Sequence, residues 1–324
     1  MRRESKYKNE RKRYMKIVVT PRGFAKCGLD NVKVIEDAGF ALEYNNTPNA
    51  YTEQEFYEKT LDADGIIVGV ERVDKAYIDA HPKLKAVVKF GVGTDNIDTT
   101  YCEQKGIFVG KTVGSNARSV AETAISFILA DSKNLYESIL ATKQHGWAKL
   151  TGYEIENKIL GIVGFGAIGK WVARMAYGLG MQVIAYDPFF TDAEVAKAYH
   201  VEFVDFEAIL KNADFISLHT PLTEQTRDLI ALPQLNEMKR SAVLINTARG
   251  GIVNETDLYV ALSENRIKAA YFDVFSSEPP KADEPLLTLP NFYLTPHIAS
   301  RSKEAEKKTA DMATKIIIEQ LKKV

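Results

Sequence analysis

Three glycines ahead of a predicted helix have the spacing of a phosphate-binding turn. They follow directly on the apolar run 159–163, and a helical pattern begins after them. In such a turn the first glycine permits the sharp bend, the second lets the backbone approach a pyrophosphate, and the third lets the helix pack on the sheet. The helix N-terminus then presents free N–H groups and a positive dipole end to the phosphates. We therefore expect a dinucleotide site at Gly164, Gly166, Ala167, Ile168 and Gly169.

An acidic residue ends the next predicted strand. Asp187 follows the run 182–186, eighteen residues after Gly169. A carboxylate at this point accepts hydrogen bonds from the adenosine ribose and repels the extra phosphate of NADP. The residues that follow, Pro188 and Phe189, bring no positive charge to reverse this preference. A turn aspartate before proline is the plainer alternative, but the complete glycine motif outweighs it, and we expect NAD.

Hydride transfer from a secondary alcohol to a nicotinamide leaves a hydroxyl proton that a base must accept. Histidine is the usual base because it titrates near neutral pH. Five are available. Three of them, at positions 81, 145 and 200, fall beside a proline, in a polar connection and at the end of a polar helix. His219 and His297 each follow a predicted strand, where open α/β sheets bind ligands, and residue types alone leave both open.

The elements that position these residues alternate along the chain. In the first part, strand-like runs at 17–19, 65–68, 86–88 and 107–109 are separated by helical patterns at 31–38, 53–61, 74–80 and 98–105. Asp74 and Asp98 are suited to cap the N-termini of the last two of these helices. A second series has strand-like runs at 159–163, 182–186, 215–218, 242–245 and 269–272. Strands with little apolar and polar alternation, separated by helices, predict an α/β protein with parallel sheets covered on both faces.

Two longer helical patterns lie between and after these series. One runs from Ser119 to Thr142, with an apolar stripe at 121–135, and suits a bridge between domains; the other runs from Arg301 to Leu321. At 324 residues the chain exceeds what one hydrophobic core usually organises. We therefore expect two doubly wound parallel-sheet domains connected by ordered elements.

The bulk composition excludes several classes. A formal net charge of −1 gives no general attraction to nucleic acid or to an anionic membrane. The two cysteines, Cys27 and Cys102, form no CxxC or Cys/His cluster, so we expect no metal site and a cytoplasmic location. No apolar run is long enough to span a membrane. Residues 1–15 hold seven Lys or Arg and two Glu, and we expect a loose tail there rather than a nucleic-acid arm.

Three segments together resemble a known family. These are 246–251 (Asn-Thr-Ala-Arg-Gly-Gly), 272–279 (Phe-Asp-Val-Phe-Ser-Ser-Glu-Pro) and 295–300 (Thr-Pro-His-Ile-Ala-Ser). In this order they resemble the signatures of the D-isomer-specific 2-hydroxyacid dehydrogenases. The likeness extends through 89–98, 119–122 and 219–223. It implies a Rossmann NAD-binding domain at 116–299, inserted in a flavodoxin-like substrate domain at 16–115 and 300–324.

The resemblance also implies roles for individual residues. His297 matches the general base, Glu278 the carboxylate that orients it, and Arg249 the residue that binds the substrate carboxylate and polarises the C2 oxygen. Val92 and Gly93 match a backbone segment on the other side of that carboxylate. Each of these residues alone also has a plain structural explanation, and the ordered set favours catalysis. Further implied cofactor contacts are His219, Thr220, Pro221, Thr247, Ala248, Asp273 and Ala299, the last of which is glycine in many relatives.

The substrate is less constrained than the reaction class. The segments at 18–22 and 89–93 resemble the phosphoglycerate dehydrogenase branch, and Arg22 and Lys89 would suit a second anionic group such as a phosphate. Alternatives are a hydroxypyruvate, glyoxylate or other 2-keto acid reductase, and an NADH-sensing protein like the C-terminal-binding corepressors. Formate dehydrogenases share this architecture but carry glutamine where Glu278 stands, which argues against that activity. We also expect a homodimer, for which the apolar stripe at 121–135 is a candidate surface.

Overall fold

A computed structural model describes residues 14–324, so most of the predicted basic tail lies outside the described residues. The chain divides into two compact units. Unit 1 comprises the chain up to Ser115 together with Glu306–Val324, and unit 2 is Asn116–Ala305. The first division is where the sequence analysis put it. The second falls in the first turn of the last helix, α13 (Lys303–Leu321), rather than at 299/300.

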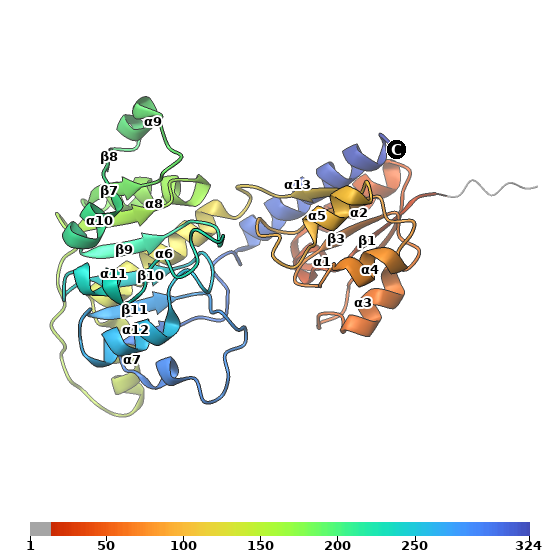
Figure 1. The fold of residues 1–324 in the computed structure, drawn as a ribbon. Helices are drawn as coiled ribbons and strands as arrows, with labels where there is room; N and C mark the ends of the chain where they lie inside the picture. Colours follow the sequence, from red (N-terminus) through yellow and green to blue (C-terminus); the bar gives the residue numbers. More distant parts are fainter. Residues whose placement is uncertain (1–13) are drawn as a thin grey trace, which may run out of the picture. The chain divides into compact units, whose positions relative to one another are not determined.

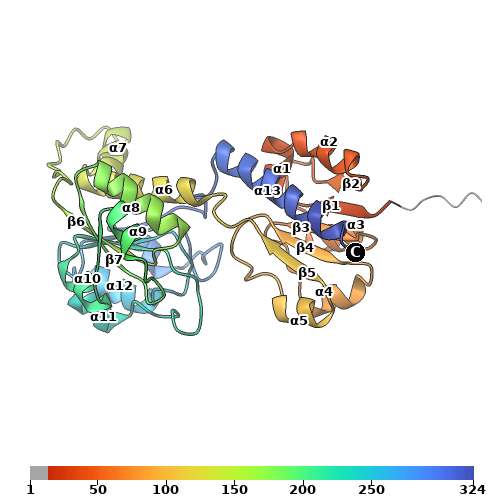
Figure 2. The ribbon, with the colours of Figure 1, turned by 90° about the horizontal axis from the view of Figure 1, so that it is seen from above.

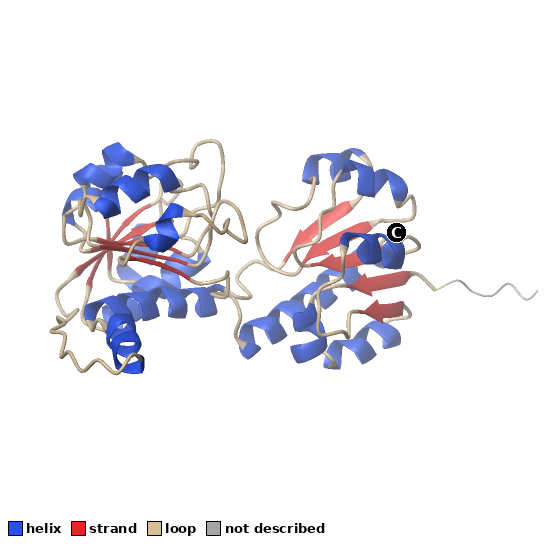
Figure 3. Ribbon diagram, turned by 90° about the horizontal axis from the view of Figure 1, so that it is seen from below, coloured by secondary structure: helices blue, strands red, loops and turns tan. Residues whose placement is uncertain are grey.

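Unit 1 is built on a five-stranded, all-parallel sheet in the order β2-β1-β3-β4-β5. Helices cover both of its faces (Figures 1 and 3). Phe24, Ile35 and Ile317 bury one face beneath α1, α2 and α13, while Phe56, Tyr77 and Cys102 bury the other beneath α3, α4 and α5. The elements are β1 (Lys16–Val19), α1 (Arg22–Cys27), α2 (Asp30–Asp37), β2 (Ala41–Tyr44), α3 (Glu53–Thr60), β3 (Gly65–Val68), α4 (Lys75–Ala80), β4 (Ala86–Lys89), α5 (Thr99–Gln104) and β5 (Phe108–Lys111).

Unit 2 is built on a seven-stranded, all-parallel sheet in the order β12-β11-β10-β9-β6-β7-β8. The strand order reverses between β6 and β9, and ligands bind at such a reversal in open α/β sheets. The elements are α6 (Ala117–Ser132), α7 (Leu135–Lys143), β6 (Ile159–Val163), α8 (Ala167–Gly178), β7 (Gln182–Tyr186), α9 (Ala193–Ala198), β8 (Val201–Phe203), α10 (Phe206–Asn212), β9 (Phe215–Leu218), α11 (Leu232–Glu237), β10 (Val243–Asn246), α12 (Glu255–Ser263), β11 (Ala269–Phe272), a 3-10 turn (Pro285–Thr288) and β12 (Phe292–Leu294).

The predicted fold class, two parallel-sheet α/β units, is confirmed, and so is much of its local detail. Asp74 and Asp98 cap α4 and α5, accepting from the backbone N–H groups of Tyr77 and Tyr101. Strands β2 and β8 and the short helix α1 were not predicted from the sequence. None of the helices between residues 14 and 324 is long and apolar enough to cross a membrane.

The expectation of one long bridging helix at 119–142 is wrong. The segment forms two helices, α6 and α7, because Asn134 adopts a left-handed conformation (φ 47°) between them. Asparagine tolerates that conformation better than most residues, and its side chain donates to the carbonyl of Thr151 (3.1 Å). Both helices belong to unit 2 (Figure 2). On α6, the apolar residues Ala121, Ala124 and Ile128 are buried in the core of the same unit.

Candidate active site

The predicted functional residues of unit 2 follow successive strands along one edge of its sheet. In spatial order, His297 follows β12, Glu278 lies in the loop after β11, and Arg249 follows β10. His219 follows β9, the glycine turn follows β6 and Asp187 follows β7. In a parallel sheet all these carboxyl ends share one edge, so residues far apart in sequence lie along the edge at which open α/β sheets form a ligand crevice.

His297 and Glu278 form a direct pair. The imidazole Nδ1 lies 2.8 Å from Glu278 Oε2, and both side chains are partly exposed, at 46% and 39%. We assign the proton on Nδ1 to this bond, which leaves Nε2 for a substrate. The other carboxylate oxygen of Glu278 accepts the backbone N–H of Phe275 at 3.0 Å, so Glu278 is oriented from both sides.

The turn that carries His297 is held by a buried carboxylate. Asp273, 1% exposed, accepts from the hydroxyl of Thr295 (2.6 Å) and from the backbone N–H groups of Ile298 (2.8 Å) and Ala299 (2.7 Å). These bonds fix the backbone on both sides of His297, whose φ is 53°. Asp273 is also expected to contact the cofactor, and its observed partners make it a support for the His297 turn. Ala299 is buried in the same turn, and its carbonyl accepts from Ser119 (2.7 Å).

Arg249 lies half-buried in a loop that Asn246 folds. The Asn246 side chain donates to the carbonyl of Arg249 (2.9 Å) and accepts from the N–H of Ala248 (3.0 Å). The Arg249 guanidinium donates through Nη1 to the carbonyl of Ala248 at 2.7 Å. In the sequence, Asn246 stands out only as the first residue of the 246–251 signature. An asparagine directly after the apolar run 242–245 was the signal that could have identified its role.

His219 differs from His297 in its burial and in its hydrogen-bond partners. Its Nε2 lies 2.8 Å from the Ser217 hydroxyl, while its Nδ1 is buried and has no hydrogen-bond partner among residues 14–324. Burial lowers the pKa of His219 to about 3, so the ring is neutral at physiological pH. A neutral, buried ring that does not meet the His297–Glu278 pair does not compete for the role of base. These contacts favour His297 over His219 as the candidate base, a choice that residue types left open.

Gly164 and Gly169 lie too close to other backbone atoms to carry a side chain. A Cβ on Gly164 (φ 96°) would lie 2.7 Å from the carbonyl oxygen of His219, and one on Gly169 would lie 2.3 Å from that of Gly164. By contrast, no atom lies within 4 Å of a Cβ on Gly166. Asp187 joins the turn by accepting the backbone N–H of Phe165 at 2.8 Å. Gly164 and Gly169 are thus needed for packing, and Gly166 leaves open space beside the backbone.

The predicted substrate residues of unit 1 lie at the carboxyl edge of its own sheet. Arg22 begins α1 after β1 and donates to the carbonyl of Pro48 (3.0 Å). Lys89 ends β4 and donates to the Gly69 carbonyl and to the Asn96 side chain, both at 2.5 Å. Val92 and Gly93 follow in the next turn, where Val92 is 37% exposed. Lys89 therefore also holds the loop after β3.

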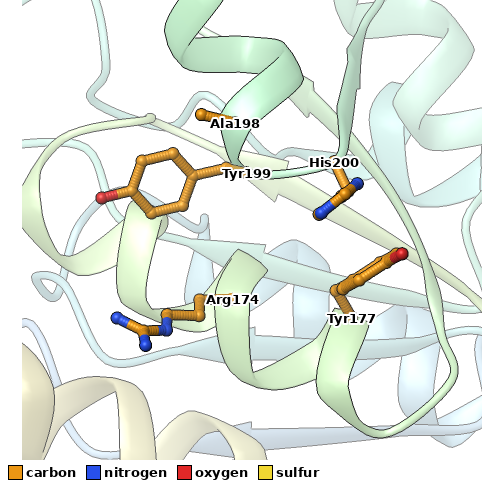
Figure 4. A pocket seen from close by; sticks show the side chains of 5 residues that line it. All are labelled: Arg174, Tyr177, Ala198, Tyr199 and His200. Carbon is orange, nitrogen blue, oxygen red and sulfur yellow. The ribbon is translucent and has the colours of Figure 1, made fainter.

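A surface pocket of about 590 Å³ lies elsewhere in unit 2. Arg174 and Tyr177, from the last turns of α8, face Tyr199 and His200, which follow α9 (Figure 4). The rings of Tyr177 and His200 stack at 3.9 Å. Because α8 begins at the glycine turn and the pocket lies at its other end, this pocket is separate from the crevice.

Comparisons with known proteins decide the family. Residues 125–299 match the model "D-isomer specific 2-hydroxyacid dehydrogenase, NAD binding domain". The chain belongs to the D-isomer-specific 2-hydroxyacid dehydrogenase family. It is similar to the glyoxylate reductase of Korarchaeum cryptofilum, with 38% identity over 81% of this chain and 80% of the relative. It is also similar to the D-3-phosphoglycerate dehydrogenase of Methanocaldococcus jannaschii, with 40% identity over 91% of this chain but only 55% of that longer relative.

A solved structure of the family gives the same fold. The D-lactate dehydrogenase of Aquifex aeolicus, complexed with NAD and lactic acid, superposes with a TM-score of 0.80 over 95% of this chain and 97% of that chain, at 26% identity. The residues of unit 2 fit an NAD. The turn leaves space at Gly166, and two buried polar atoms at the crevice, His219 Nδ1 and Thr247 Oγ1, have no partner among residues 14–324. Unit 2 therefore carries the NAD site of this dehydrogenase family.

The open space at Gly166 gives a prediction for cofactor binding. Gly166→Ala meets no atom of the protein, so the fold should lose less than about 1 kcal/mol at this helix cap. The methyl group should instead occupy the approach of the pyrophosphate and raise the Kd for NADH at least about tenfold. Fluorescence titration with NADH and thermal unfolding measure the two effects separately.

Gly178→Ala is a matched control at the other end of the same helix, where an added Cβ also meets no atom. It should leave NADH affinity unchanged. Unchanged affinity in Gly166→Ala as well would contradict the assignment of this turn to the pyrophosphate.

Proposed function

We propose that this family member is an NAD-dependent oxidoreductase that interconverts a small D-2-hydroxy acid and its 2-keto acid, with His297, Glu278 and Arg249 as its catalytic residues. The observation that carries the proposal is the His297–Glu278 pair at 2.8 Å, on the same sheet edge as the glycine turn. A base with one ring nitrogen fixed by a carboxylate and the other left for substrate is what proton transfer to a carbonyl oxygen requires.

In the direction of reduction, Arg249 binds the carboxylate of the keto acid through its planar, permanently charged guanidinium. His297 then donates its Nε2 proton to the C2 oxygen as C2 gains a hydride. Bound NADH supplies that hydride, and Glu278 stabilises the positive imidazolium before the proton leaves. In oxidation the same residues act in reverse: His297 accepts the hydroxyl proton as the C2 hydride departs. Asp187, beside the glycine turn, favours NAD by repelling the 2′-phosphate of NADP.

The names of the relatives support an enzyme and give no support to the corepressor-like alternative. They do not agree on one substrate, since they include a phosphoglycerate dehydrogenase, a glyoxylate reductase and a lactate dehydrogenase. Lys89 already donates two short hydrogen bonds to protein acceptors, which reduces its capacity to bind a phosphate. Arg22 is therefore the better candidate for a second anionic group of the substrate.

The first test addresses the dyad. His297→Ala should lower kcat for keto-acid reduction by about 10²–10⁴-fold, because it removes the proton donor, and should leave NADH affinity unchanged. Glu278→Gln should move the pH profile of reduction to lower pH, because the imidazolium loses its negative partner. Steady-state kinetics between pH 5 and 9 measure both effects. A near-normal kcat in His297→Ala would contradict the assignment of His297 as the proton donor.

The second test addresses the substrate. The kcat/KM values for 3-phosphohydroxypyruvate, hydroxypyruvate, glyoxylate, pyruvate and a branched 2-keto acid, each with NADH, should identify one preferred compound. If the phosphorylated compound is preferred, Arg22→Ala should abolish that preference while sparing the others. Lys89→Ala should weaken activity on all of them, because it releases the loop after β3. Preference for an unphosphorylated acid would leave the general reaction intact and remove the phosphoglycerate assignment.

We also propose a cytoplasmic homodimer, with a different surface from the one expected. The stripe on α6 is largely buried in its own unit, whereas α7 and the loop after it expose apolar side chains, including Ile139 (51%), Trp147 (81%) and Leu150 (48%). Neighbouring exposed apolar residues of this size mark an association surface. Sedimentation should give twice the chain mass, and the double variant Ile139→Asp/Trp147→Asp should be a monomer. A monomeric unmodified protein would contradict the dimer proposal.

The proposed cytoplasmic location is supported by the free thiols of Cys27 and Cys102, since disulfides are rare in that compartment. Cell fractionation tests this location.

A further inference from the structure

The peptide bond between Phe275 and Ser276 is held from two sides. On one side lies the backbone of Gly250, the residue after Arg249. A Cβ on Gly250 would lie 2.1 Å from the Phe275 carbonyl carbon and 2.3 Å from the Ser276 nitrogen. No side chain fits between these two segments. The loop that carries Arg249 and the loop that carries Glu278 are therefore in backbone contact.

On the other side lies Glu255, the first residue of α12. Its Oε1 accepts the backbone N–H of Ser276 at 2.8 Å, and its Oε2 accepts the Ser276 hydroxyl. Both carboxylate oxygens are thus used by one residue of the loop. The preceding N–H, that of Phe275, is bound by Glu278 itself at 3.0 Å.

The surroundings of Glu255 are unfavourable for a charged carboxylate. It makes no ion pair among residues 14–324 and is held by hydrogen-bond donors of Ser276. Burial raises the pKa of Glu255, and the charges of Glu284 and Asp228 act in the same direction, against the Ser276 bonds. A half-buried carboxylate without a cation costs free energy. Its bonds to the Glu278 loop offset this cost.

These contacts form a chain of bonds that ends at the proposed base. Glu255 holds Ser276, the adjoining N–H of Phe275 orients Glu278, and Glu278 holds His297 Nδ1 at 2.8 Å. We propose that Glu255 is a positioning residue, which acts through the backbone of Ser276 and Phe275 to keep the Glu278 carboxylate in line with His297. This inference rests on the proposed function of the His297–Glu278 pair.

The kinetic test is a double-mutant cycle. Glu255→Gln should lower kcat about tenfold, an ordinary coupling for residues in one network, and leave NADH affinity unchanged. It should move the pH profile of reduction in the same direction as Glu278→Gln, by a smaller amount. In the Glu278→Gln background it should change kcat less than about twofold, because the carboxylate through which it acts is gone. Equal losses in both backgrounds, or no loss in either, would overturn the proposal.

Two further variants control for stability and charge. Glu264→Gln removes an acid at the other end of α12, where Glu264 pairs with Arg266 on the surface, and should change neither kcat nor the pH profile. Ser276→Ala keeps the Glu255 charge and the backbone bond but removes the hydroxyl bond, and should lower kcat about two- to threefold. If Glu255→Gln does not fold, Ser276→Ala serves in the same cycle with Glu278→Gln.

A measurement that needs no turnover separates this inference from the proposed function. The ¹⁵N resonances of the His297 ring, assigned by comparison with His297→Ala, report its bond to Glu278. Glu255→Gln should shift them toward the values of Glu278→Gln. That shift in a protein that reduces no keto acid would support the positioning role and reject the proposed function. Active protein whose His297 resonances and kcat are the same with and without Glu255 would reject the positioning role alone.

Discussion

The parallel arrangement of all seven strands in unit 2 is the constraint on which its site depends. Each strand must be followed by a crossover that covers a sheet face and returns to the opposite edge. Every loop that leaves a carboxyl end therefore emerges on the same side. The glycine turn after β6, Arg249 after β10 and His297 after β12 share one edge for this reason, although more than 130 residues separate the first from the last.

Backbone packing at this edge is closer than side chains allow. Gly164 packs against the carbonyl of His219, and Gly250 packs against the peptide after Phe275. In both places two loops from different strands meet through main-chain atoms, which cannot adopt alternative rotamers as side chains do. These contacts hold the loops at fixed separations. They therefore also fix the positions of the functional side chains that lie beside these glycines. Glycine is required here for contact, and at Gly164 also for its positive φ.

Buried and partly buried polar groups carry out the remaining positioning. Asp273 binds the turn around His297, Asn246 folds the loop of Arg249, and Asp187 binds the N–H of Phe165 in the glycine turn. In each case a side chain at the end of a strand accepts or donates bonds that a loop backbone would otherwise leave unsatisfied. The groups that we propose meet a ligand are different ones: His297 Nε2, the Arg249 guanidinium, and the atoms of His219 and Thr247 that have no partner among residues 14–324. Asp273 and Asn246 therefore support the loops, whereas Asp187 both supports the glycine turn and places a negative charge beside the proposed cofactor.

The sequence by itself determined the fold class, most strands, the two aspartate helix caps, the glycine turn and the family, because these depend on patterns within a few neighbouring residues. It did not determine that the pattern at 119–142 breaks at Asn134, since that depends on a bond to Thr151. Only the tertiary structure showed that Asp273 supports the His297 turn, that Lys89 binds Gly69, and that Glu255 reaches Ser276. Each of these bonds joins segments at the carboxyl ends of different strands. The distance between such residues is decided by sheet order and register, which no local pattern encodes.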